Sequence, residues 1–177
     1  MTARSTDSAP PFGFRCKTCG VWHEGVPLDF GSDLPQIAIP PDEFGTRVWN
    51  DGDFCVVDER EFFIRGCLEI PVRGAPGPLV YGVWTSLSDN SFGRARELAA
   101  GAPLPPDEPP WFGWFANSLD GYPETLLLKA RVQARPGGMR PTIELEPTDH
   151  PLAVEQREGI TAERLIEIVR RLVHAGK

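Results

Sequence analysis

Two apolar runs, Phe62-Phe-Ile-Arg-Gly-Cys-Leu-Glu-Ile70 and Leu79-Val-Tyr-Gly-Val-Trp-Thr-Ser-Leu87, set the architecture of this chain. Each run is rich in β-branched and aromatic residues and is followed by a turn-forming residue, which is typical of β-strands. Residues 80–84 are apolar at successive positions, a pattern that indicates a central strand covered on both faces. We therefore expect a sheet built around these two strands.

The rest of the chain also favours β-structure. The 177 residues include 18 glycines and 19 prolines, a density that produces short strands and turns. Further strands are predicted at 54–57, 111–117, 125–134 and 142–146, and with the first two they would form one antiparallel sheet. Leu126-Leu-Leu128 should be buried on both faces, whereas 142–146 alternates and should be half-buried.

The short connection Asp58-Glu-Arg-Glu61 predicts a hairpin between the strands at 54–57 and 62–70. An even-numbered loop would place Cys55 opposite Ile64 and turn Cys67 to the other face of the sheet. An odd-numbered loop would reverse this and allow the two cysteines to share a face. A buried free thiol is the commoner role for each of them.

A C-terminal helix is the clearest element, because Leu165, Ile168, Val169 and Leu172 recur at helical spacing and Thr161 can cap the start. A shorter helix is predicted at 91–100. Residues 101–110 contain five prolines and should form an extended surface connection. The predicted fold class is therefore α+β, a single domain at 12–177 that follows a disordered polar tail at 1–11.

Charge and hydropathy limit the classes of partner. The net charge of -7 and a pI near 5.0 repel phosphate backbones, so nucleic acid is not expected as a partner. No run approaches the roughly 18 apolar residues of a membrane span, and the first eleven residues lack an apolar signal segment. Reduced cysteines in such a chain fit a cytoplasmic protein.

One motif has a definite chemical reading: Cys16, Cys19 and His23 stand as Cys-x2-Cys-x3-His, the pattern of a zinc knuckle. Two thiolates and an imidazole supply three of the usual four zinc ligands. The fourth is left open between distant protein groups and water. The protein candidates are Cys55, Cys67, Asp149 and His150.

Two functions follow from this motif. The first is a zinc-stabilised, non-catalytic binding domain for a protein or small ligand, with an aromatic recognition surface drawn from Trp111-Phe-Gly-Trp-Phe115 and Trp84. On a strand, Trp111, Gly113 and Phe115 would share one face and Phe112 and Trp114 the other. The alternative is a zinc-dependent hydrolase with a water in the open position and a glutamate as general base. The candidate bases are Glu144, Glu146, Glu155 and Glu158.

Four blocks of the sequence resemble a bacterial family known as domain of unknown function 2199. They are Phe14-Arg-Cys-Lys-Thr-Cys-Gly20, Phe62-Phe-Ile-Arg-Gly-Cys-Leu-Glu-Ile-Pro71, Tyr81-Gly-Val-Trp-Thr-Ser-Leu-Ser88 and Glu144-Leu-Glu-Pro-Thr-Asp-His-Pro-Leu-Ala-Val-Glu-Gln-Arg-Glu-Gly159. The likeness spans about residues 14 to 174. It implies a small cytoplasmic bacterial protein, and it implies no activity and no catalytic residue.

Overall fold

The computed structural model describes residues 13–15, 22–24, 29–36 and 39–174. Its centre is the antiparallel pair predicted from the two apolar runs, β6 (Glu61–Ile70) and β7 (Leu79–Leu87). They are in register from Phe62–Leu87 to Ile70–Leu79. Alternate residues of β6, among them Ile64, Leu68 and Ile70, enter the main core, as the period of two requires.

The sheet is mixed, so the prediction of a purely antiparallel sheet is wrong. Its strand order is β3-β7-β6-β10-β9-β8, with β5 and then β4 added at β6. β3 runs parallel to β7 and β10 runs parallel to β6, whereas the other pairs are antiparallel. Parallel neighbours are joined by long connections, so local sequence does not reveal them. The added strands are β3 (Asp29–Gly31), β4 (Val48–Asn50), β5 (Phe54–Val57), β8 (Trp111–Trp114), β9 (Lys129–Gln133) and β10 (Thr142–Leu145).

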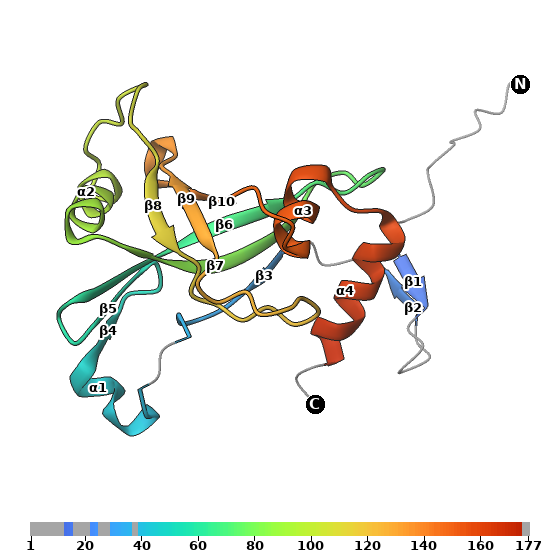
Figure 1. Cartoon of the computed structure of the whole chain (residues 1–177), viewed down its shortest axis with the longest axis horizontal. Helices are drawn as coiled ribbons and strands as arrows, with labels where there is room; N and C mark the ends of the chain where they lie inside the picture. Colours follow the sequence, from blue (N-terminus) through green and yellow to red (C-terminus); the bar gives the residue numbers. More distant parts are fainter. Residues whose placement is uncertain (1–12, 16–21, 25–28, 37–38, 175–177) are drawn as a thin grey trace, which may run out of the picture.

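The sheet curls until the end of β8 meets β7 again (Figure 1). Phe115 forms an isolated bridge with Thr85, and the Ala116 amide donates to the Trp84 carbonyl at 2.9 Å. This approach requires Gly113, because a Cβ there would overlap the carbonyl oxygen of Ser86. The curled sheet encloses the main core, which includes Phe115 and Val132.

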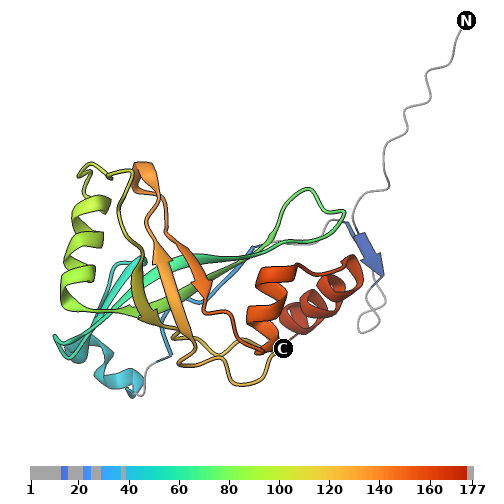
Figure 2. The same ribbon diagram turned by 45° about the horizontal axis from the view of Figure 1, so that its top comes forward.

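Helices cover the two ends of the sheet (Figure 2): α2 lies at one end, and α3 and α4 lie together at the other. The predicted C-terminal helix is confirmed as α4 (Ala162–His174), which buries Leu165, Ile168 and Val169. Thr161 accepts a hydrogen bond from the Arg164 amide, as a cap should. The predicted shorter helix is α2 (Asp89–Ala99), capped by Ser88.

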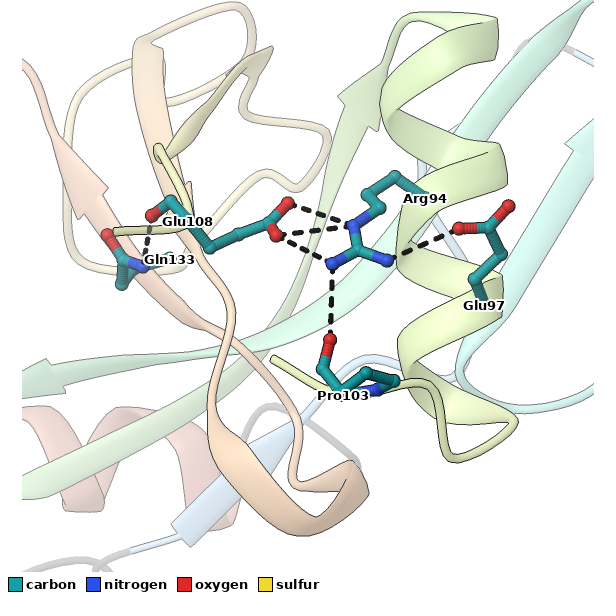
Figure 3. Close-up of polar contacts among 5 residues, drawn as sticks. All are labelled: Arg94, Glu97, Pro103, Glu108 and Gln133. Atoms are coloured by element: carbon teal, nitrogen blue, oxygen red, sulfur yellow. Dashed lines mark hydrogen bonds and ion pairs between the residues drawn. The ribbon is translucent and has the colours of Figure 1, made fainter. Parts of the chain in front are cut away.

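The proline-rich segment 101–110 has no helix or strand, as predicted, and an ion pair fixes it to α2 (Figure 3). Arg94 donates Nε and Nη2 to the carboxylate of Glu108, with the Nη2 bond at 2.7 Å, and it also donates to the Pro103 carbonyl. The hydrogen bonds from Arg94 lower the pKa of Glu108. A second, longer contact joins Arg94 to Glu97.

Three local features were predicted wrongly, missed or left open in the sequence. The strand expected at 125–134 begins only at Lys129, because Leu127 adopts a positive φ of 62° within a turn. A helix, α3 (Pro151–Glu158), was not predicted, since Pro151 occupies its first turn. The β5–β6 loop is odd-numbered, because Val57 pairs with Glu61 and Cys55 with Phe63.

The remaining elements are small. The 3-10 turns η1 (Pro41–Glu43) and η2 (Pro136–Gly138) and the single-turn helix α1 (Phe44–Arg47) join longer elements. Near the N-terminus, β1 (Gly13–Arg15) and β2 (Trp22–Glu24) form a separate antiparallel pair, which lies beside α4 in both views (Figures 1 and 2). None of the helices in the described residues is long and apolar enough to cross a membrane.

Candidate functional site

The predicted metal ligands fall at the N-terminal strand pair. Cys16 and Cys19 lie outside the described residues, and of His23 only the backbone is described, opposite Phe14. Arg15 pairs antiparallel with Trp22, and both cysteines lie between these two residues in the sequence. Among the described residues, no group of three or more His, Cys, Asp or Glu side chains could hold a metal ion. The zinc site therefore stays a prediction.

Three of the four distant candidates for a fourth ligand, Cys55, Cys67 and His150, have other contacts in the structure. Cys55 is completely buried in a second core cluster beside Trp84, and burial raises the pKa of its thiol to about 11, which disfavours a thiolate. Cys67 is half-buried and accepts a contact from Arg135 at 3.5 Å. The two thiols share a face, but Cys67 lies four residues along β6 from the partner of Cys55, which corresponds to about 13 Å.

His150 caps α3, as Nδ1 accepts a hydrogen bond from the Leu152 amide at 3.2 Å. Its neighbour Asp149 is exposed at the turn before the helix. A nitrogen that accepts a hydrogen bond carries no proton, so in this arrangement the ring proton is on Nε2. The imidazole thus stabilises the helix start through an N-cap contact.

The four glutamates considered as general bases are dispersed. Glu144 is exposed on β10, Glu146 is exposed just after its end, and Glu158 is exposed at the end of α3. Glu155 is half-buried and accepts from the Tyr122 hydroxyl at 2.6 Å and from Arg164 Nε at 2.7 Å. Both contacts hold its carboxylate in a bridge between α3, α4 and the 119–125 turn. To act as a general base, the Glu155 carboxylate would first have to break its hydrogen bonds with Tyr122 and Arg164.

The aromatic segment is where the structure and the sequence prediction agree most closely. Trp111 and Phe115 point into the core, whereas Phe112 and Trp114 point outward and are 54% and 40% exposed. The two outer rings meet edge to face, with their centroids 5.1 Å apart. Trp84, which was expected to join them, is instead fully buried and donates to the Ser32 carbonyl. The exposed aromatic surface therefore consists of Phe112 and Trp114 and does not include Trp84.

A third exposed apolar side chain, Leu127, lines the same groove as Trp114. Leu127 is 70% exposed, and its positive φ is a conformation that non-glycine residues rarely adopt. Its amide donates to the Phe115 carbonyl at 2.8 Å, which fixes the turn against the end of β8. Backbone strain of this kind persists only where surrounding contacts enforce it, and it clusters at functional sites. We call Phe112, Trp114 and Leu127 the outer apolar patch.

A groove of about 680 Å³ begins at the outer apolar patch. Two residues of the patch, Trp114 and Leu127, line it together with Val57, Phe63 and Ala116. Arg47, which also lines it, is held by Asp58 and Glu43, and their carboxylates raise its pKa. The groove is therefore lined by apolar side chains together with several polar and charged ones, Arg47 and Asp58 among them.

The sheet neighbours of the patch carry charge. Phe112 pairs with Arg131 and Trp114 pairs with Lys129 on β9. β10 lies on the far side of β9 and presents Glu144 opposite Arg131. The outer face therefore passes from an aromatic row to a basic row to an acidic row.

Fold and site together define a small mixed α+β protein with a curled sheet, two helical ends and one exposed aromatic face. The family described as "Uncharacterized protein conserved in bacteria (DUF2199)" matches residues 15–160, and the chain belongs to it. This confirms the family resemblance noted from the sequence. No curated protein and no solved structure matches the chain.

Sequence reasoning missed Leu127 and the groove. Leu127 was assigned to a buried strand, and only its backbone conformation reveals that the side chain is exposed. The groove joins residues from β5, β6, β8 and the 126–127 turn, which no local pattern connects. The alternation at 111–115 was the single signal that could be read directly from the sequence.

Proposed function

We propose that this protein is a non-catalytic binding domain that engages a partner through the outer apolar patch and the adjoining groove. The observation that supports this most is a set of three exposed apolar side chains: Phe112 and Trp114 contact each other, and Leu127, on a strained backbone, lines the same groove as Trp114. Contiguous exposed apolar surface on a small protein commonly marks an interaction site. Trp is also enriched among residues that dominate binding energy.

A paired variant tests this role. Phe112→Ser combined with Trp114→Ser removes both aromatic rings of the patch but leaves Trp111 and Phe115 in the core. Affinity capture from lysate of the encoding bacterium should enrich at least one protein with the native chain and lose it with the paired variant. Trp49→Ser is the matched control, since Trp49 is similarly exposed but lies on β4 against Arg96. Identical captured proteins for all three chains would contradict the proposal.

We further propose that the N-terminal hairpin is held by zinc through Cys16, Cys19 and His23. The support is the ligand spacing together with the chain reversal between β1 and β2. Metal content of protein purified without chelator should show zinc that is lost in a Cys16→Ser, Cys19→Ser variant. A Cys55→Ser variant is the control, because its buried thiol has no part in the hairpin. Equal zinc in the native chain and the N-terminal variant would refute this part.

A further inference from the structure

The outer face of the sheet orders its charges relative to the aromatic pair. Neighbouring strands are about 4.8 Å apart, so the β9 cations directly flank the aromatic rings and the β10 carboxylates lie one strand farther away. A partner that covers the rings therefore meets positive charge first. Across the three strands, Phe112 is followed by Arg131 and Glu144, and Trp114 is followed by Lys129 and Glu146.

The two cations differ in their availability. Lys129 lies 3.6 Å from Glu146, a pair in which both side chains are about half exposed. Arg131 is exposed and makes no ion pair within the part of the chain that the structure describes. Its guanidinium can form two parallel hydrogen bonds with a carboxylate, which a lysine cannot do. Arg131 is therefore the cation beside the patch that is free to receive an acidic group.

The spacing of the aromatic rings suits an extended chain. Phe112 and Trp114 are two residues apart on one strand face, a repeat of about 6.8 Å. Alternate side chains of an extended peptide have the same repeat, so two of them can contact the two rings in succession. The residue between them, or one beside them, can then reach sideways to β9.

We propose that the outer apolar patch binds an extended acidic–apolar peptide segment of a partner protein, with apolar side chains on Phe112 and Trp114 and a carboxylate on Arg131. This inference rests on the proposed function. Charge complementarity at Arg131 selects the acidic class, and Glu144 and Glu146 oppose spread of the acidic peptide beyond β9. A nucleic acid fits less well, because its phosphates repeat along the strand, whereas a single arginine, unpaired among the described residues, with Glu144 and Glu146 beyond it can receive one carboxylate.

The test uses a displayed library of short random peptides selected on the full chain, with counter-selection on the Phe112→Ser, Trp114→Ser variant. Enriched peptides should combine Asp or Glu with Leu, Ile or Phe at alternate positions. An enriched peptide, labelled with fluorescein, is then titrated by anisotropy. Arg131→Glu should weaken its binding by about tenfold or more. Arg73→Glu, the same charge change in the exposed turn between β6 and β7, should leave it unchanged.

Four results would overturn the inference. Enrichment of basic peptides would show that the acidic class is wrong while leaving the patch as a binding surface. Binding of a labelled single-stranded oligonucleotide that Arg131→Glu abolishes would assign a nucleic acid instead. Dimerisation of the native chain that the paired serine variant abolishes, measured by sedimentation, would assign a second copy. If no peptide is enriched over the variant, the inference fails, and partner capture then decides the proposed function independently.

Discussion

Asn117 is a single residue on which the meeting of β7 and β8 depends. Its side chain is buried, accepts from the Trp84 amide at 2.6 Å and donates to the Leu34 carbonyl at 3.1 Å. Asn117→Ala leaves both backbone groups unpaired, and we expect the free energy of unfolding to fall by about 2–3 kcal/mol. Urea unfolding measures this. Asn90→Ala, at an exposed position of α2, should change it by less than about 0.5 kcal/mol.

Substitution of Leu127 is expected to raise the free energy of unfolding, in contrast to substitution of Asn117. Leu127→Gly relieves the positive φ and removes a side chain that is mostly exposed. We expect unfolding stability to rise by about 0.5–1 kcal/mol, since the strain removed exceeds the flexibility that glycine adds to the unfolded chain. Leu126→Gly, at a half-buried position with ordinary φ, should lower stability instead. A comparable loss in both variants would show that the Leu127 side chain serves the fold.

At this scale the sequence predicts what strand periodicity controls and little else. The inward and outward residues of 111–115 were assigned correctly, because successive side chains of a strand must alternate. Leu126-Leu-Leu128 was assigned wrongly, because three apolar residues in a row look the same in a buried strand and in a strained turn. The difference lies in φ, which depends on the hydrogen bonds that the turn makes with Phe115 and Asn117.

The link between α2 and the proline-rich segment is an element-scale feature with a predicted pH dependence. Arg94 lowers the pKa of Glu108 below its ordinary value of 4.5, so the contact stabilises the fold above that pH and is lost as pH falls through the lowered pKa. Glu108→Gln should therefore reduce the melting temperature at neutral pH.

The difference between the native chain and Glu108→Gln should shrink as pH falls below about 4.5. Melting curves at several pH values test this. Glu97→Gln is the matched control, because Glu97 pairs with the same arginine but is far more exposed. A difference that persists unchanged into acid would show that Glu108 contributes through packing rather than charge.

The elements with clear local sequence patterns, α4, β6 and β7, were predicted correctly. α4 combines a cap at Thr161 with an apolar stripe, and β6 and β7 combine length with β-branched residues. α3 lacks such a signal, because its cap is a histidine and Pro151 also fits a turn. The parity of the β5–β6 hairpin was left open in the sequence, and positive φ values at Asp58 and Glu59 accompany the odd-numbered loop.

For the whole molecule, the α+β class follows from the sequence but the topology does not. The two parallel pairings join segments that are far apart in the chain, and the meeting of β8 with β7 depends on the absence of a side chain at Gly113. The same holds for the binding surface, which takes a strand, a turn and a groove from separate segments. The zinc motif differs from the binding surface, because its ligand spacing can be recognised in the sequence, whereas its cysteines lie outside the described residues.

We infer above all that the outer aromatic rings serve a partner and not the fold. Urea unfolding of the Phe112→Ser, Trp114→Ser variant tests this directly, with Phe115→Ala as the reference. Phe115 is completely buried, so its truncation should cost about 3–5 kcal/mol. The paired serine variant should lose at most about 2 kcal/mol, because both rings are roughly half exposed. A loss equal to or greater than that of Phe115→Ala would contradict the claim.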